Sequence, residues 1–167
     1  VSLVGGKWTT FRALGEHLAH DVLAMMGRNP GPSSASAPIG GGRDFPRGTT
    51  ERTDWITQHR GSLSAERAGV LLDRYGTIAR WLIEQLNEGE TPLEQVADYS
   101  VEEIRWIIHH ESVYSLSDIT HRRTLLAFLG KLSEAGAEEI ASIARDEFGW
   151  STKRYRTELA DALAQTG

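Results

Sequence analysis

Residues 68–89 read AGVLLDRYGTIARWLIEQLNEG, and this stretch decides the fold. Large apolar side chains recur every three or four residues, first over 68–75 and again over 78–86, with a glycine after each run. This spacing places the apolar side chains on one face of a helix, and glycine is suited to ending a helix. The stretch therefore predicts two short amphipathic helices, the first ending at Gly76 and the second near Gly89.

The same spacing recurs on both sides of this stretch and predicts an all-α fold, a bundle of about seven helices. A bundle is expected because each apolar stripe needs a partner surface. The apolar segment Val1–Val4 instead predicts the remaining end of a strand. The other helices are expected near residues 11–25, ending at Gly27; over Thr50–Arg60; around Val101, Ile104, Ile107 and Ile108; from a cap at Ser117 through Ile119, Leu125, Leu126, Phe128 and Leu129; around Ile140 and Ile143, ending at Gly149; and from a cap at Ser151 through Leu163.

Residues 28–48 interrupt this helical pattern and predict a linker. Four of the five prolines lie there, together with Gly40-Gly41-Gly42. Proline lacks a backbone donor and glycine is conformationally permissive, so neither favours a long regular element. The sequence therefore predicts three parts: residues 1–27 with a strand end and a helix, the linker 28–48, and a helical domain over 49–167.

Composition narrows the classes of function. The formal net charge is −5 and the basic residues are dispersed, which argues against nucleic acid as a partner. The absence of cysteine excludes disulfides, thiolate zinc sites and a cysteine nucleophile, and fits a cytoplasmic protein. No apolar run approaches the roughly 20 residues that a membrane-spanning helix needs. A signal peptide is not visible either.

Residues 5–12, GGKWTTFR, are the most informative for function. Paired glycines let a backbone approach a ligand closely, and the helix expected next, with Thr9 or Thr10 as its cap, begins with unpaired amides and a positive dipole end. Lys7 adds a full positive charge there. Together these features predict a wall of a site for an anionic or electron-rich group. An ordinary strand–turn–helix junction remains the alternative.

Other candidate residues are less specific. His17 and His20 could chelate a metal at their spacing, and a metal site is also considered at His109-His110. Neither pair has a third ligand, so no metal site is predicted. Arg122-Arg123 follows Asp118 by one helical turn, which allows either a surface ion pair or an anchor to another domain. No nucleophile elbow, dinucleotide fingerprint or P-loop is present, so no catalytic residue is assigned.

The segment 5–12 closely resembles the one that ends the flavin-binding part of FAD-dependent glycerol-3-phosphate dehydrogenases. The resemblance extends in the same order over essentially all 167 residues, although the later matches are less specific. Ser115 departs from the family, where threonine is more frequent, and this difference bears only on a helix cap. The later matches are Ala37-Pro38-Ile39-Gly40-Gly41, Tyr75-Gly76-Thr77, His110-Glu111 with Asp118 and Arg122-Arg123, and Phe148-Gly149-Trp150-Ser151.

The resemblance implies a C-terminal helical domain of an enzyme that oxidises sn-glycerol 3-phosphate to dihydroxyacetone phosphate. It implies that Gly6, Lys7, Trp8 and Thr9 line the pyrimidine side of FAD in the complete enzyme. FAD is not expected on these 167 residues alone, which would be non-catalytic. The implied partners are the upstream FAD-binding and substrate domains. A homo-oligomer, and a peripheral membrane or quinone contact at the inner face of the membrane, belong to the complete enzyme.

Two other classes of protein stay open on the residues alone. One is a stand-alone helical protein-interaction module, because a helical bundle with no recognisable catalytic motif needs no further explanation. The other is a small helical protein that binds a metal or a ligand.

Overall fold

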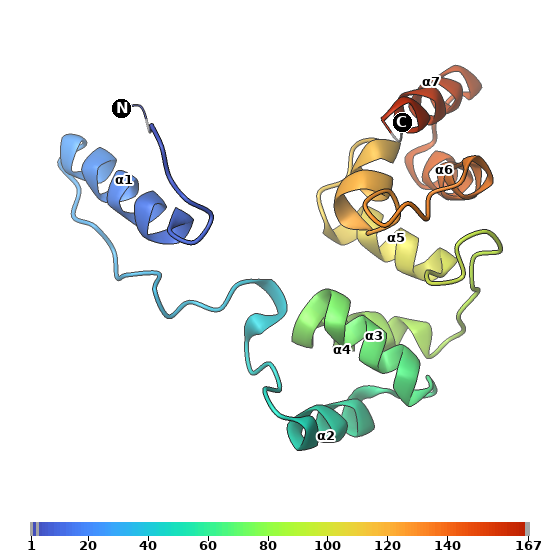
Figure 1. Cartoon of the computed structure of the whole chain (residues 1–167), viewed down its shortest axis with the longest axis horizontal. Helices are drawn as coiled ribbons and strands as arrows, with labels where there is room; N and C mark the ends of the chain where they lie inside the picture. Colours follow the sequence, from blue (N-terminus) through green and yellow to red (C-terminus); the bar gives the residue numbers. More distant parts are fainter. Residues whose placement is uncertain (1, 3, 166–167) are drawn as a thin grey trace. The chain divides into compact units, whose positions relative to one another are not determined.

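The computed structural model describes residue 2 and residues 4–165, and it divides into two units, 1–45 and 46–167 (Figure 1). Over the described residues the regular elements are seven α-helices and three short helical turns, with one isolated β-bridge between Pro92 and Ser100. The all-α prediction is confirmed. The predicted strand end falls partly outside the described residues, and Ser2 and Val4 have no regular secondary structure.

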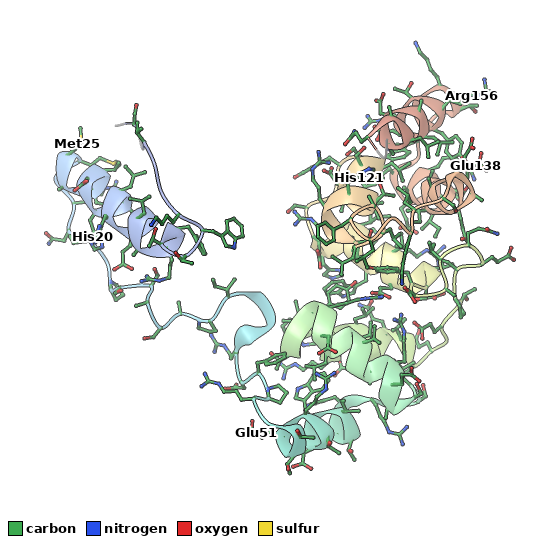
Figure 2. All side chains as sticks on the ribbon, viewed as in Figure 1. His20, Met25, Glu51, His121, Glu138 and Arg156 are labelled. Carbon is green, nitrogen blue, oxygen red and sulfur yellow. The ribbon has the colours of Figure 1, made fainter. Side chains whose placement is uncertain are left out.

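The first unit contains helix α1, Phe11–Met25, and one 3-10 turn, η1, Gly40–Gly42. Helix α1 ends as expected: Gly27 adopts a φ of 68°, and the Arg28 amide donates to the Leu23 carbonyl at 2.8 Å. None of its residues is buried, and side chains such as Met25 stand exposed along it (Figure 2). The single turn at η1 lies in the predicted linker, where one hydrogen bond joins Gly42 to Ile39.

The second unit is a bundle in which each helix packs against the next one along the chain. Its core is apolar, with Leu71, Leu82, Ile104 and Ile140 almost fully buried. No helix in the described part of the chain is long and apolar enough to cross a membrane. The elements are α2 (Thr49–His59), α3 (Ala65–Tyr75), η2 (Gly76–Ile78), α4 (Ala79–Leu86), α5 (Val101–His110), the π-helical turn η3 (Asp118–Arg123), α6 (Glu134–Phe148) and α7 (Thr152–Ala164).

Serine hydroxyls and glycines fix the helix boundaries in this unit. The hydroxyl of the residue before a helix accepts an amide of its first turn at α3, α5, α6 and α7. The predicted cap at Ser151 is confirmed by its bond with the Arg154 amide, at 3.2 Å. Gly149 ends α6 in the left-handed conformation, at a φ of 65°, as predicted.

The predicted fifth helix is wrong in its capping side chain and in its length. Ser117 already has helical dihedrals and caps nothing with its side chain. Ser115 and Asp118 instead bond reciprocally: the Ser115 amide donates to the Asp118 carboxylate at 3.0 Å, and the Asp118 amide donates to the Ser115 hydroxyl at 3.2 Å. The helical turn ends at Arg123, because Thr124 is extended, with a φ of −121° and a ψ of 164°.

The chain beyond Arg123 therefore does not bury the apolar residues that suggested a longer helix. On a continuous helix Leu125, Leu126, Phe128 and Leu129 would spread over an arc of about 160°, which is wider than an apolar stripe of about 100°. The turn over residues 124–130 buries Leu126, which is 1% exposed, and leaves the other three exposed.

Candidate functional site

The sequence-predicted site, residues 6–9, is exposed and lies directly before α1, with residues 7–10 in one turn. Gly5 and Gly6 have φ angles of 92° and 126°, a region that side chains other than glycine rarely adopt. A Cβ atom on Gly6 would lie 2.9 Å from Cδ2 of Leu14, which is too close for an ordinary contact. The backbone at Gly6 thus favours glycine for its dihedral angle, whereas the contact involves only the end of the flexible Leu14 side chain.

The start of α1 carries unpaired donors. Thr10 precedes the helix but does not cap it with its side chain, contrary to expectation. Its hydroxyl instead accepts from the Lys7 amide at 3.3 Å and donates to the Lys7 carbonyl at 3.2 Å, closing the turn that holds residues 7–10. The first turn contains no acidic residue, so the positive end of the helix dipole meets no carboxylate from that turn.

Lys7 and Trp8 place a cation and a flat apolar ring on the same turn. Trp8 is 91% exposed, and its ring centroid lies 6.0 Å from that of Phe11. Lys7 is exposed, and its ammonium group has no hydrogen bond within the described chain. The structure thus brings Gly6, Lys7, Trp8 and Thr9 together beside a helix N-terminus, and their contact with a flavin stays a prediction.

The linker is tied to α1 through the carboxylate of Glu16. Arg12 donates to this carboxylate at 2.7 Å, and the amide and hydroxyl of Ser34 donate to it at 3.2 Å and 3.1 Å. Hydrogen bonds from Ser33 and then from Arg12 lower the pKa of Glu16 from 4.5 to about 2. One ionised side chain therefore positions the start of the linker against the helix that follows the glycine turn.

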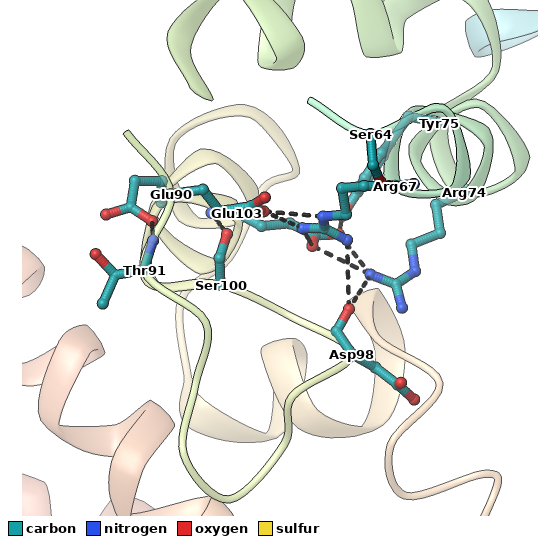
Figure 3. Close-up of polar contacts among 10 residues, drawn as sticks. Ser64, Arg67, Arg74, Tyr75, Glu90, Thr91, Asp98, Ser100 and Glu103 are labelled. Atoms are coloured by element: carbon teal, nitrogen blue, oxygen red, sulfur yellow. Dashed lines mark hydrogen bonds and ion pairs between the residues drawn. The ribbon is translucent and has the colours of Figure 1, made fainter. Parts of the chain in front are cut away.

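A buried carboxylate, Glu103 on α5, is the centre of a polar network in the second unit (Figure 3). Its oxygens accept from Arg67 at 2.7 Å, from Arg74 at 2.9 Å and from the Tyr75 hydroxyl at 2.7 Å, all from α3. Burial, and then the negative charge of Glu103, raises the pKa of Tyr75, so this phenol remains a donor.

Further bonds close the network around the two arginines. Arg67 Nε also binds Glu90 at 2.9 Å, and Arg74 binds the Asp98 carbonyl at 2.8 Å while stacking over the Tyr99 ring at 3.8 Å. The network joins α3 to α5 and to the segment between α4 and α5, so its role is structural. We call Glu103 and its three partners Arg67, Arg74 and Tyr75 the Glu103 clamp. Sequence analysis missed it, although the spacing of seven between Arg67 and Arg74 places them on one helix face.

Arg122 and Arg123, from the end of η3, border a pocket of about 340 Å³. Arg122 pairs with Asp118 at 3.1 Å, one of the two roles considered from the sequence, whereas Arg123 has no hydrogen bond within the described residues and interacts with Glu111 through its charge. Burial raises the pKa of Glu111. The other lining residues include Tyr75 and Tyr99, so the clamp forms one wall of the pocket.

His109 and His110 each have a partner within the bundle. His109 lies 2.8 Å from Glu147, and His110 bonds the Trp106 carbonyl at 2.9 Å while stacking on the Trp106 ring. Across residue 2 and residues 4–165, no group of three His, Cys, Asp or Glu side chains is placed to hold a metal ion.

This helical unit, preceded by a glycine–lysine turn, belongs to a recognised class. Residues 32–155 match the family described as the C-terminal domain of alpha-glycerophosphate oxidase, and the chain belongs to this family. Among similar proteins, the mitochondrial glycerol-3-phosphate dehydrogenase of Rattus norvegicus is 28% identical over 97% of this chain and 23% of its own length. The glycerol-3-phosphate dehydrogenases of Synechocystis and Mycobacterium leprae are 25% and 24% identical over 92% and 96% of this chain.

The chain spans about a quarter of the length of these relatives: 23% of the rat protein and 28% of each of the two bacterial ones. The matches with relatives cover 92% to 97% of this chain, and the family match begins at residue 32. The likeness to glycerol-3-phosphate dehydrogenases thus includes residues beyond the helical domain itself.

Proposed function

We propose that these residues form the C-terminal part of an FAD-dependent glycerol-3-phosphate dehydrogenase that converts sn-glycerol 3-phosphate into dihydroxyacetone phosphate. The observation that carries the proposal is the match, over nearly the whole chain, to proteins named glycerol-3-phosphate dehydrogenase. The glycine–lysine turn at the start of α1 supports it, because this turn offers cationic and amide donors to an anionic or electron-rich group.

The residues of the turn suit a flavin in chemical character. Bound FAD would supply the acceptor for the hydride that leaves the substrate. In the proposal Gly6 allows close approach of the backbone, Lys7 contributes a positive charge, and Trp8 and Thr9 complete the wall on the flavin's pyrimidine side. Lys7 and the free amides of α1 would stabilise negative charge on the ring system.

The remaining catalytic groups belong, in this proposal, to FAD-binding and substrate domains upstream in the complete protein. The 167 residues alone are then inactive and do not retain FAD. We place the complete enzyme in the cytoplasm or at the inner face of the membrane, where a quinone is one electron acceptor to test.

The test compares the complete protein encoded by the gene with the 167-residue chain. We expect the complete protein to copurify with FAD and to form dihydroxyacetone phosphate from sn-glycerol 3-phosphate in the presence of an artificial electron acceptor. The 167-residue chain should do neither. A flavin-free complete protein with no turnover would refute the proposal, and turnover by the short chain would refute its inactivity.

A stand-alone interaction module is the second candidate, and one observation favours it. Leu125, Phe128 and Leu129 are all exposed within five residues of one turn, as in an interaction surface. A gene that encodes only these 167 residues would favour this candidate over the enzyme.

A further inference from the structure

The turn over residues 124–130 holds three large apolar side chains in solvent. Leu125, Phe128 and Leu129 are 56%, 84% and 54% exposed. Single exposed apolar residues are common on protein surfaces, but three within five residues form a patch that needs an explanation. We call these three residues the apolar tip.

The apolar tip is held in place by buried anchors. Leu126 is 1% exposed, and the Leu125 amide donates to the Tyr99 hydroxyl at 3.2 Å. The Thr124 hydroxyl donates to the Ile119 carbonyl at 2.9 Å, and the Lys131 amide to the Leu126 carbonyl at 2.8 Å. These anchors hold the backbone of the tip so that its three apolar side chains are exposed. A partner would therefore bind side chains whose backbone is already ordered, which lowers the entropic cost of binding.

Positive charge lies directly beside the apolar tip, although the chain as a whole carries a net charge of −5. The Arg122 side chain is half-exposed and forms an ion pair with Asp118. Arg123 is exposed and has no hydrogen bond in the described part of the chain. Both line the 340 Å³ pocket, and so does Leu125 of the tip. The surface thus offers projecting apolar side chains next to a hollow that is bordered by Arg122 and Arg123 and also lined by the carboxylates of Asp73 and Glu111.

We propose that the apolar tip, with Arg122 and Arg123, is the surface by which this domain docks onto the N-terminal remainder of the complete protein. The inference rests on the proposed function. The matched relatives continue for about three quarters of their length outside the region shared with this chain. In the proposal, the rest of the complete protein is therefore a docking partner larger than this domain. The charges specify that neighbour: an apolar hollow for Phe128, with carboxylates that pair with the two arginines.

Interface chemistry agrees with this assignment. Phenylalanine and arginine are enriched at the buried centres of protein interfaces, where a few side chains dominate the affinity. A planar guanidinium binds a carboxylate through two parallel hydrogen bonds, which fixes the orientation of a partner as well as its sign of charge. Arg123 has these donors free of hydrogen bonds in the described chain, and this leaves them to the docked domain.

The absence of native cysteine from these residues permits a direct accessibility test. Phe128→Cys is introduced into the complete protein and into the 167-residue chain, and maleimide labelling at position 128 is followed by peptide mass spectrometry. Glu138→Cys is the control, because Glu138 is exposed on α6 and glutamate is depleted at interface centres (Figure 2). We expect position 128 to react at least about tenfold more slowly in the complete protein, where labelling requires local opening.

A second comparison tests the charges. Adding Arg123→Glu to Phe128→Cys in the complete protein should restore fast labelling, because the reversed charge would face the partner's carboxylates. Arg156→Glu, on the exposed side of α7, is the matched control and should leave labelling slow (Figure 2).

Equal labelling of position 128 in the two proteins would overturn the docking proposal, even if the complete protein oxidises glycerol 3-phosphate. Protection that develops in the 167-residue chain as its concentration rises would assign the tip to a second copy and overturn it too. Protection that appears only with phosphatidylserine vesicles would assign it to a membrane surface, with the same consequence. A complete protein that protects position 128 but lacks FAD and turnover would support docking and refute the proposed enzyme.

Discussion

The hydroxyl of Tyr75 on α3 donates a 2.7 Å hydrogen bond to Oε1 of Glu103 on α5, a carboxylate with no exposed surface. Two arginines of α3 neutralise the same carboxylate, so a buried charge is fully satisfied by one neighbouring helix. Such an arrangement stabilises a fold only while it is complete, because removal of one member leaves buried charge without a partner. Glu103 is therefore the residue on which the packing of α3 against α5 depends.

Replacement of Glu103 by alanine should lower the free energy of unfolding of the second unit by about 3–5 kcal/mol, since Arg67 and Arg74 lose their buried counter-charge. Urea denaturation followed by circular dichroism measures this change. Glu138→Ala, at an exposed position of α6, should stay within about 0.5 kcal/mol of the unmodified chain. Equal effects of the two substitutions would show that the clamp contributes nothing to stability.

Substitutions in the turn that carries the apolar tip should affect stability very differently at its buried and its exposed positions. Leu126→Ala should destabilise the chain by about 2–5 kcal/mol, because it opens a cavity beneath the turn. Phe128→Ala should change stability by less than about 0.5 kcal/mol, because the side chain is 84% exposed. Thermal unfolding of both variants tests the contrast, and a larger loss for Phe128→Ala would mean that the turn packs differently.

The bond between Glu16 and the linker should depend on pH. The pKa of Glu16 is lowered from 4.5 to about 2 by its bonds with Ser33 and Arg12, so the ionised carboxylate favours the ordered linker. This contribution is fully present above pH 4.5 and is lost as the pH falls towards about 2. NMR of the Ser34 amide should show a shift over this window that is absent in Glu16→Gln. Titration of Glu16 near 4.5 would contradict the bond.

The charge at the glycine turn should matter for the cofactor of the complete protein. Lys7→Ala should weaken FAD binding or slow flavin reduction by roughly tenfold or more, since hydrogen bonds to charged groups contribute about 1.5–3 kcal/mol. Lys153→Ala, at an exposed position of α7, should leave both quantities unchanged. Flavin content and stopped-flow absorbance measure the effects. Identical values for Lys7→Ala and the unmodified protein would remove Lys7 from the proposed flavin site.

Local sequence signals predicted most of the bundle. Glycines after apolar runs predicted the ends of α3 and α6, and the start of α7 followed from Ser151, because these residues act on the backbone within a few positions. The fifth helix failed because four apolar residues near position 126 were assumed to be buried, whereas the packed face accommodates Leu126 alone. That outcome depends on tertiary packing, which periodicity does not describe.

The two polar sites differ in how far the sequence predicted them. Gly6 and Lys7 are adjacent in sequence, so their proximity before a helix followed directly from the motif. The Glu103 clamp joins residues that are 28 to 36 positions apart, and the sequence around Glu103 reads equally well as a surface capping box after Ser100. Only the packing of α5 on α3 reveals that this carboxylate turns inward.

Anaerobic mixing of the complete protein with sn-glycerol 3-phosphate tests the central claim most directly, with flavin absorbance near 450 nm as the signal. We predict that the absorbance bleaches when the substrate is added and that one dihydroxyacetone phosphate forms for each flavin reduced. A complete protein whose bound flavin keeps its absorbance in the presence of saturating glycerol 3-phosphate would contradict the assignment to this class of dehydrogenase.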